Sequence, residues 1–211
     1  YDWGSVKFYA MEQEMFSMPE IEERPFPPFL PPKAVVMMMG TFPPKAEKRT
    51  MEFHYPNFQN DMWRVHGLIF FDDPQHFQKK DEKAFDAEKI KAFLTAKGIA
   101  SCPTVRRAIR EHNNASDQFL EVVETVDLAA VLKKIPRCRQ IGTTGGKATE
   151  ILFGILGLKF KDFHLGETIK TEYNGRELSI TRLPSTSRAY PMKLAKKAEY
   201  YRAFFTAAGV L

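Results

Sequence analysis

The sequence has few cysteines, no metal-binding spacing and no long apolar run. Only Cys102 and Cys138 occur in 211 residues, which argues against a disulfide scaffold and favours a reducing, cytoplasmic compartment. Two cysteines are too few for a structural zinc site, and the five histidines lack the H-x3-H spacing that could supplement them. No run of eighteen apolar residues exists, so no segment is expected to span a membrane. We therefore expect a protein without metal, cofactor or membrane partner.

The composition is that of one globular domain. Its hydrophobic fraction of 44% and charged fraction of 27% are ordinary, and 211 residues are enough to bury a substantial core. The net charge of +5 is compatible with a nucleic-acid partner, although scattered lysines on a solvated surface would give the same value. We expect the protein to be a monomer.

Proline separates an N-terminal segment from the rest of the chain. Residues 19–32 read PEIEERPFPPFLPP, and this proline density disfavours both helix and central strand. We therefore expect residues 1–32 to be an extended lead-in along the surface and residues 33–211 to form the domain.

Short apolar runs and helical periodicities alternate through residues 33–211. The run KAVVMMMG predicts a fully buried strand, and Asn174-Gly175 predicts a hairpin turn into a later strand. Asp127 is the expected N-cap of one helix, and Pro191 is expected in the first turn of the last. The predicted strands are 33–40, 99–105, 139–142 and 177–183, and the predicted helices are 58–70, 85–97, 127–134, 146–156 and 191–208. This alternation predicts an α/β fold: a three-layer α/β/α domain with a central, mainly parallel four-stranded sheet.

Three loops follow predicted strands, where ligands bind in such sheets. The first loop (residues 40–44, GTFPP) is Gly- and Pro-rich, although an ordinary strand-terminating turn would look the same. The second loop (residues 142–148, GTTGGKA) lacks the spacing and hydroxyl of a Walker A motif, leaving a glycine turn that can hold an anion or merely start a helix. The third loop (residues 184–188, PSTSR) suits a DNA phosphate or caps the next helix.

Residues 53–64 (FHYPNFQNDMWR) combine aromatic rings with side-chain amides. An aromatic ring can stack on a nucleobase, and an amide can bond a base edge or position a water. The alternative is an aromatic cluster that lines the core, with a helix cap at Asn60.

Taken in order, these segments resemble one superfamily. GTFPP resembles the first motif of the mismatch-specific, thymine-type and hypoxanthine-type DNA glycosylases of the uracil-DNA glycosylase superfamily. HYPNFQNDMW is similar to their H-x-Y-P-x-x-x-N-x-F-W segment, LPSTSRA to their Pro-Ser-x-Ser loop, and TTGGKA to the strand-turn-helix that precedes that loop. The similarity extends from about Lys33 to Tyr201. It implies a monofunctional DNA N-glycosylase that acts in base-excision repair.

Two departures from the family pattern concern the chemistry. Many members carry Asp or Asn in the first motif to activate water, where this chain has Phe42. The branch with His-Pro-Ser in the third motif uses that histidine on the base carbonyl, where this chain has Leu183. The hypoxanthine-type branch also lacks a polar residue in the first motif and uses a downstream asparagine, which Asn60 matches.

The resemblance implies a role for each candidate residue. Asn60 orients the attacking water, while backbone N–H groups around Thr41 and Phe42 stabilise the charge on the leaving base. The expected base-binding residues are Tyr55, which stacks on the flipped base, Gly40 and Phe53, and the expected DNA-binding residues are Ser185, Thr186, Ser187, Arg188 and Lys147. The base itself (uracil, hypoxanthine or mismatched thymine) is left open.

Two other functions fit the same residues. A catalytically impaired protein that binds DNA lesions on this fold is consistent with Phe42 and Leu183 at catalytic positions. The second is a nucleotide- or phosphosugar-binding enzyme of doubly wound type. The defective Walker spacing and the lack of a G-x-G-x-x-G motif argue against it.

Overall fold

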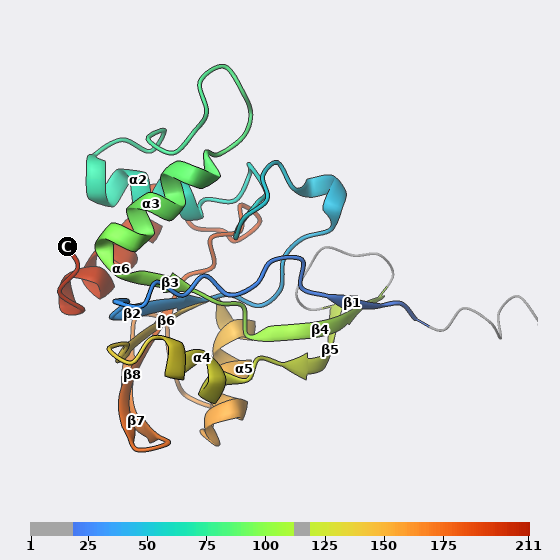
Figure 1. The fold of residues 1–211 in the computed structure, drawn as a ribbon, viewed down its shortest axis with the longest axis vertical. Helices are drawn as coiled ribbons and strands as arrows, with labels where there is room; N and C mark the ends of the chain where they lie inside the picture. Colours follow the sequence, from blue (N-terminus) through green and yellow to red (C-terminus); the bar gives the residue numbers. More distant parts are fainter. Residues whose placement is uncertain (1–18, 112–118) are drawn as a thin grey trace, which may run out of the picture.

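The computed structural model describes residues 19–111 and 119–211, so residues 1–18 of the predicted lead-in lie outside the described part. Figure 1 shows a central sheet between two layers of helices, with a smaller sheet projecting to one side. The central sheet comprises β2 (Val36–Met39), β3 (Ile99–Ser101), β6 (Gln140–Thr144), β7 (Thr168–Tyr173) and β8 (Arg176–Leu183). The helices are α2 (Met62–Phe71), α3 (Ala87–Lys97), α4 (Leu128–Lys134), α5 (Gly146–Leu156) and α6 (Leu194–Ala207), with a short 3-10 turn η1 (Ala46–Lys48). The smaller sheet comprises β1 (Ile21–Glu23), β4 (Val105–Arg110) and β5 (Leu120–Thr125).

The central sheet has five strands in the order β3-β2-β6-β8-β7. Its first four strands are parallel, but β7 pairs antiparallel with β8. The predicted sheet is therefore one strand short, and the real sheet is mixed. The hairpin explains the fifth strand, because Asn174 and Gly175 have φ values of 49° and 74°, which return the chain directly beside β8.

The apolar run of β2 is buried on both faces of the sheet, as its sequence predicts. Val36 and Met38 pack in a cluster with residues of α2, α3 and α6. Met37 and Met39 point the other way, into a cluster with residues of α4 and α5. This alternation follows from the two-residue period of a strand, and Figure 1 shows the same two helical layers.

The predicted strand 99–105 is in fact two strands in two sheets. Strand β3 ends at Ser101 and β4 begins at Val105. Between them lies Pro103, which has no N–H to donate to a β-ladder. Strand β4 then pairs antiparallel with β1 and β5. Residues Ile21–Glu23 of the proline-rich segment, which form β1, are therefore part of this smaller sheet.

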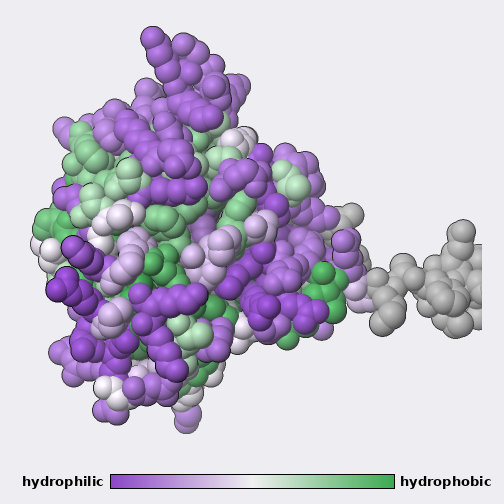
Figure 2. Space-filling view, viewed as in Figure 1, coloured by the Kyte–Doolittle hydropathy of each residue, from purple (hydrophilic) through white to green (hydrophobic). Residues whose placement is uncertain are grey.

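Two predicted helix ends are confirmed by their caps, whereas the helix expected over residues 58–70 begins only at Met62. The Asp127 carboxylate accepts from the Ala130 N–H at 3.0 Å, and Gly98 ends α3 at a φ of 70°. The last helix begins at Leu194 rather than near Pro191, because Lys193 at its N-cap is still extended. No helix within the described ranges is long and apolar enough to cross a membrane. Hydrophilic residues cover most of the face shown in Figure 2, with hydrophobic ones gathered toward its middle.

Candidate functional site

One cavity of about 610 Å³ lies at the carboxyl ends of the parallel strands. Strands β2, β6 and β8 run in the same direction, so the loops after them emerge at one edge of the sheet. Residues of the first loop, of the 55–60 segment and of the third loop line this cavity together. The lining includes Gly40, Thr41, Phe42, Tyr55, Asn60, Thr144, Ser185, Thr186, Ser187 and Arg188. Segments far apart in sequence are therefore brought together as the sequence predicts.

Tyr55 reaches across the cavity wall to the end of β6. Its hydroxyl lies 3.1 Å from the Thr144 hydroxyl, and its ring meets Trp63 edge-on at a centroid distance of 6.1 Å. A Cβ at Gly40 would lie 2.7 Å from the Tyr55 Oη. Gly40 is thus needed for the close approach of Tyr55 to the first loop. Tyr55 also has a φ of 53°, a costly conformation for a bulky residue that is often found at functional sites.

Asn60 lines the cavity immediately before α2. Its Oδ1 accepts from the Met62 N–H at 2.9 Å, a local side-chain-to-backbone bond that fixes the orientation of the side-chain amide just before the helix. An amide oxygen has two lone pairs and the amide nitrogen has two protons. One lone pair of Oδ1 is used by Met62, so Asn60 can still accept from a water and donate to a ligand.

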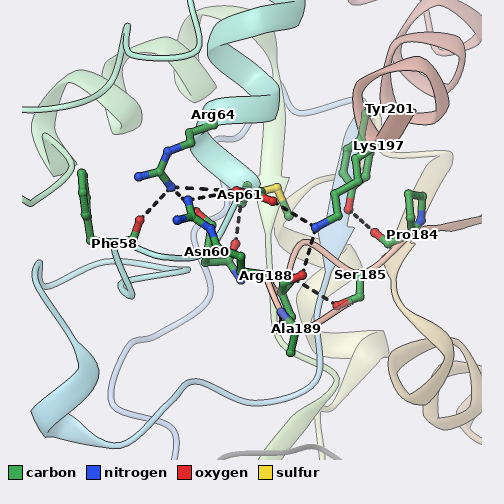
Figure 3. A network of polar contacts seen from close by, with 12 residues as sticks. Phe58, Asn60, Asp61, Arg64, Pro184, Ser185, Arg188, Ala189, Lys197 and Tyr201 are labelled. Carbon is green, nitrogen blue, oxygen red and sulfur yellow. Dashed lines mark hydrogen bonds and ion pairs between the residues drawn. The ribbon is translucent and has the colours of Figure 1, made fainter. Parts of the chain in front are cut away.

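The third loop is held by donors from two helices (Figure 3). The Asp61 N–H donates to the Thr186 carbonyl at 2.8 Å, and the Tyr201 hydroxyl donates to the Pro184 carbonyl at 2.8 Å. Lys197 Nζ donates to the Ser187 carbonyl at 2.9 Å and to Asp61 Oδ2 at 3.0 Å. With its carbonyls bonded in this way, the loop has a fixed backbone at the cavity.

Arg188 is the loop's cation. Its Nη2 lies 3.5 Å from Asp61 Oδ1, and 55% of its side-chain surface is exposed. An exposed guanidinium paired at this distance remains accessible to a phosphate.

Phe42 packs against the smaller sheet and has no group that could activate water. Its ring contacts the cluster of Val105, Ala108 and Leu120, and the Arg110 guanidinium lies 5.2 Å from the ring centroid. Arg110 also donates to the Pro43 carbonyl, which ties the first loop to β4. Leu183, at the other departure from the family pattern, is fully buried in the core.

Two predicted site residues lie elsewhere. Phe53 is not among the residues lining the cavity; its ring is buried against Phe29 and Trp63, as the core-lining alternative predicts. Lys147 lies in the first turn of α5 and is also absent from the lining. Gly145 connects its loop to the site instead, since a Cβ there would lie 3.4 Å from Ser185 Cβ.

His54 is a cavity-lining residue to which the sequence analysis assigned no role. Its Nε2 lies 2.8 Å from the Pro27 carbonyl and so donates, which leaves Nδ1 to accept from the Ser101 hydroxyl at 2.8 Å. Burial lowers the pKa of His54 to about 4, because a low-dielectric surrounding disfavours the charged ring. The histidine is therefore neutral at pH 7 and joins the proline-rich segment to the end of β3.

Phe26, from that proline-rich segment, forms part of the cavity wall. Its ring stacks on His54 at 6.4 Å, and the Arg49 guanidinium lies 5.6 Å from its centroid. No sequence signal pointed to Phe26 or Ser101, because their position depends on strand pairing. His54, by contrast, directly precedes Tyr55 in the motif and could have been found there.

The chemistry of the lining is polar but without acidic groups. None of the residues that line the cavity in the described chain is an aspartate or glutamate. Within residues 19–111 and 119–211, no three His, Cys, Asp or Glu side chains are placed to hold a metal ion. The site therefore offers amide, hydroxyl, aromatic and cationic groups.

Fold and site together define a three-layer α/β domain with a nucleobase-sized or larger cavity at its strand ends. No protein-family model and no curated protein sequence matches this chain. Among solved structures, it is similar to the solution NMR structure of a "putative Uracil DNA glycosylase" from Methanosarcina acetivorans. The TM-score is 0.60 at 20% sequence identity, and the match covers 90% of this chain and 99% of that chain. The two chains share a fold over nearly their whole lengths.

Proposed function

We propose that this protein is a monofunctional DNA glycosylase of the uracil-DNA glycosylase superfamily. It flips a damaged or deaminated base out of DNA and hydrolyses its N-glycosidic bond, the first step of base-excision repair. The observation that carries the proposal is the convergence of Tyr55, Asn60 and the third loop on one cavity. The shared fold of the Methanosarcina acetivorans protein supports it.

The reaction needs no acidic residue if the base leaves as an anion. The bond between the sugar C1′ and the base nitrogen breaks, and its electron pair goes to the base. The negatively charged DNA phosphates stabilise the positive charge that develops on the sugar. Water then adds to C1′ and releases its proton to solvent or to the departing base. The lack of carboxylates in the described lining is consistent with this route.

The residues divide the work between base, water and phosphate. Tyr55 stacks on the flipped base, as aromatic rings do in base-flipping enzymes. Backbone N–H groups of Thr41 and Phe42 bond the base oxygen where negative charge develops. Asn60 holds the attacking water through the free lone pair of Oδ1. Ser185, Ser187 and Arg188 bind the phosphates that flank the flipped nucleotide.

The groups proposed for base binding leave the choice among oxo-bases open. Backbone donors bond a carbonyl that uracil, thymine and hypoxanthine all carry. A stacking tyrosine accepts any of the three rings. Flipping costs a few kcal/mol and less for a mismatched base, so the selectivity for damage comes partly from the DNA.

Single-turnover cleavage of duplexes containing uracil, hypoxanthine or a G·T mismatch tests the proposal. Asn60→Ala should slow the chemical step by about a hundredfold or more, by analogy with other groups that position the attacking water. Asp86→Ala is the matched control, because the Asp86 side chain also accepts from a backbone N–H at a helix start, that of Lys89 at 3.0 Å, yet Asp86 is not among the cavity-lining residues. Full activity of Asn60→Ala would remove Asn60 from the mechanism.

Phosphate binding is tested separately by DNA affinity. Arg188→Gln should weaken binding to every duplex alike and reduce the salt dependence by about one counterion. A loss confined to one base would contradict the phosphate assignment.

The second candidate function is lesion binding without cleavage. It is favoured by Phe42, whose ring packs on the smaller sheet, and by buried Leu183, both at positions that carry catalytic groups in other members. Tight binding of a lesion-containing duplex with no base release at any enzyme concentration would establish it in place of the glycosylase.

A further inference from the structure

We propose that the buried ion pair of Asp61 and Lys197 is a positioning device for the site. It sets the distance between Asn60 and the third loop, and so between the attacking water and the bound phosphates. The inference rests on the proposed glycosylase function. Neither residue lines the cavity, so both act through the groups they hold.

The pair joins two elements that are distant in sequence. Lys197 projects from α6 to Asp61 at the start of α2 (Figure 3), with Nζ 3.0 Å from Oδ2. Their side chains are 1% and 9% exposed. Burying two charges is costly, and an apolar pair of similar volume is often as stable. Stability alone therefore gives little reason for a lysine at this position.

What the lysine adds is a second directed hydrogen bond. Its ammonium group donates to the Ser187 carbonyl at 2.9 Å as well as to Asp61. On the other side of the pair, the Asp61 N–H donates to the Thr186 carbonyl at 2.8 Å. The third loop is thus bonded by Asp61 at Thr186 and by Lys197 at Ser187, so two successive carbonyls of its backbone are fixed.

Asn60 is coupled to the same pair through the backbone. It precedes Asp61 directly, and a trans peptide holds neighbouring Cα atoms at a fixed distance of about 3.8 Å. The Asn60 carbonyl also accepts from Arg64 Nη1 at 3.0 Å, whose guanidinium lies 4.0 Å from the Asp61 carboxylate. A shift of the Asp61 carboxylate therefore displaces two residues that contact Asn60, namely Asp61 itself and Arg64.

The charges around Asp61 also favour an anion at the loop. Its single carboxylate faces Lys197 at 3.0 Å, Arg188 at 3.5 Å and Arg64 at 4.0 Å. One negative charge among three positive ones leaves a surplus of positive charge beside the proposed phosphate site. Lys197 neutralises Asp61 at the shortest distance, which leaves Arg188 the more exposed cation for DNA.

Lys197→Met tests the device, since methionine matches the lysine side chain up to Cε and lacks the ammonium group. We expect the single-turnover chemical step to fall by about a hundredfold, the loss that a displacement on the order of 1 Å can cause. Asp61→Asn, which removes the partner charge of Lys197 and keeps the size of the side chain and the backbone N–H, should cause a smaller loss in the same direction and keeps the proposal testable if the methionine variant folds poorly.

Leu152→Ala is the matched control for lost stability. Leu152 is fully buried on α5 in the cluster on the opposite face of the sheet. At a temperature where all variants are folded, this control should keep the wild-type chemical step. If Lys197→Met and Leu152→Ala have the same chemical rate, the positioning role is refuted.

A readout without catalysis separates this inference from the proposed function. Hydrogen exchange of the Asp61 amide, which is bonded to the Thr186 carbonyl, should accelerate in Lys197→Met and stay unchanged in Leu152→Ala. The loss of DNA affinity caused by Arg188→Gln should also be smaller in the Lys197→Met background. A wild-type protein that cleaves no duplex would overturn the glycosylase but not these two results, whereas unchanged exchange and full additivity would overturn the positioning device.

Discussion

Replacing Gly40 by alanine is the sharpest local perturbation of the site. The added Cβ would lie 2.7 Å from the Tyr55 Oη, 3.3 Å from Tyr55 Cζ and 3.3 Å from the Thr144 hydroxyl. An ordinary contact begins at 3.4 Å, so the Tyr55 hydroxyl must move by 3.4 − 2.7 = 0.7 Å to restore one. The ring cannot absorb this freely, because it packs edge-on against buried Trp63. The bond to Thr144, at 3.1 Å, is then stretched or broken.

Two costs follow from this displacement. A lost hydrogen bond reduces the free energy of unfolding by about 1 kcal/mol. A shift approaching 1 Å in a base-stacking residue should slow single-turnover cleavage by roughly tenfold to a hundredfold. Gly154→Ala is the control, since a Cβ there meets nothing within 4 Å and alanine should stabilise that helix by about 0.5–1 kcal/mol.

A double-mutant cycle identifies the clash itself. Tyr55→Phe removes the Oη atom, so adding Gly40→Ala to it should cost much less than adding Gly40→Ala to the wild type. If Gly40→Ala causes the same loss in both backgrounds, the clash with the Tyr55 hydroxyl is not the cause. Wild-type cleavage by Gly40→Ala alone would also refute the reasoning.

Two further predictions concern buried titratable groups. The pKa of His54 falls from 6.5 to about 4 on burial, so the unfolded chain binds the proton first, and the free energy of unfolding should decrease as the pH falls from 6.5 to 4. The contribution is about 3 kcal/mol at about 1.36 kcal/mol per unit; denaturant titrations should show a shallower pH dependence in His54→Gln, and an unchanged slope would contradict it. Burial raises the pKa of Cys102 and of Cys138 to about 12, so neither thiol should react with iodoacetamide at pH 8 until the protein is unfolded, which mass spectrometry can check.

The comparison of prediction and structure is clearest at the strands. The alternation in β2 and the Asn174-Gly175 turn are local signals, and both are confirmed by the fold. The division of residues 99–105 into two strands depends on which partners each half meets, and a single strand prediction was wrong there. Local pattern identifies an extended chain, but pairing decides the sheet.

The site divides in the same way. The third loop was found because it follows a predicted strand, a position that the chain order reveals, whereas Asn60 was found because it matches an asparagine of the family that the sequence resembles. Phe53 and Lys147 were assigned from neighbouring motif residues, yet neither is among the residues that line the cavity, because the orientation of a side chain depends on packing. No sequence signal predicted that Phe26 would line the cavity. Its segment is placed there by the β1–β4 pairing and by the bond from His54 to the Pro27 carbonyl.

By itself, the sequence determined the α/β alternation, the loops that carry the polar groups and the order in which they occur. These properties follow from hydrophobic period, turn residues and caps, all of which act within a few residues. Only the tertiary structure decided that Lys197 on the last helix meets Asp61, and that Phe26 of the proline-rich segment lines the cavity. Such contacts join residues far apart in the chain, and their geometry is set when the two helical layers pack on the sheet.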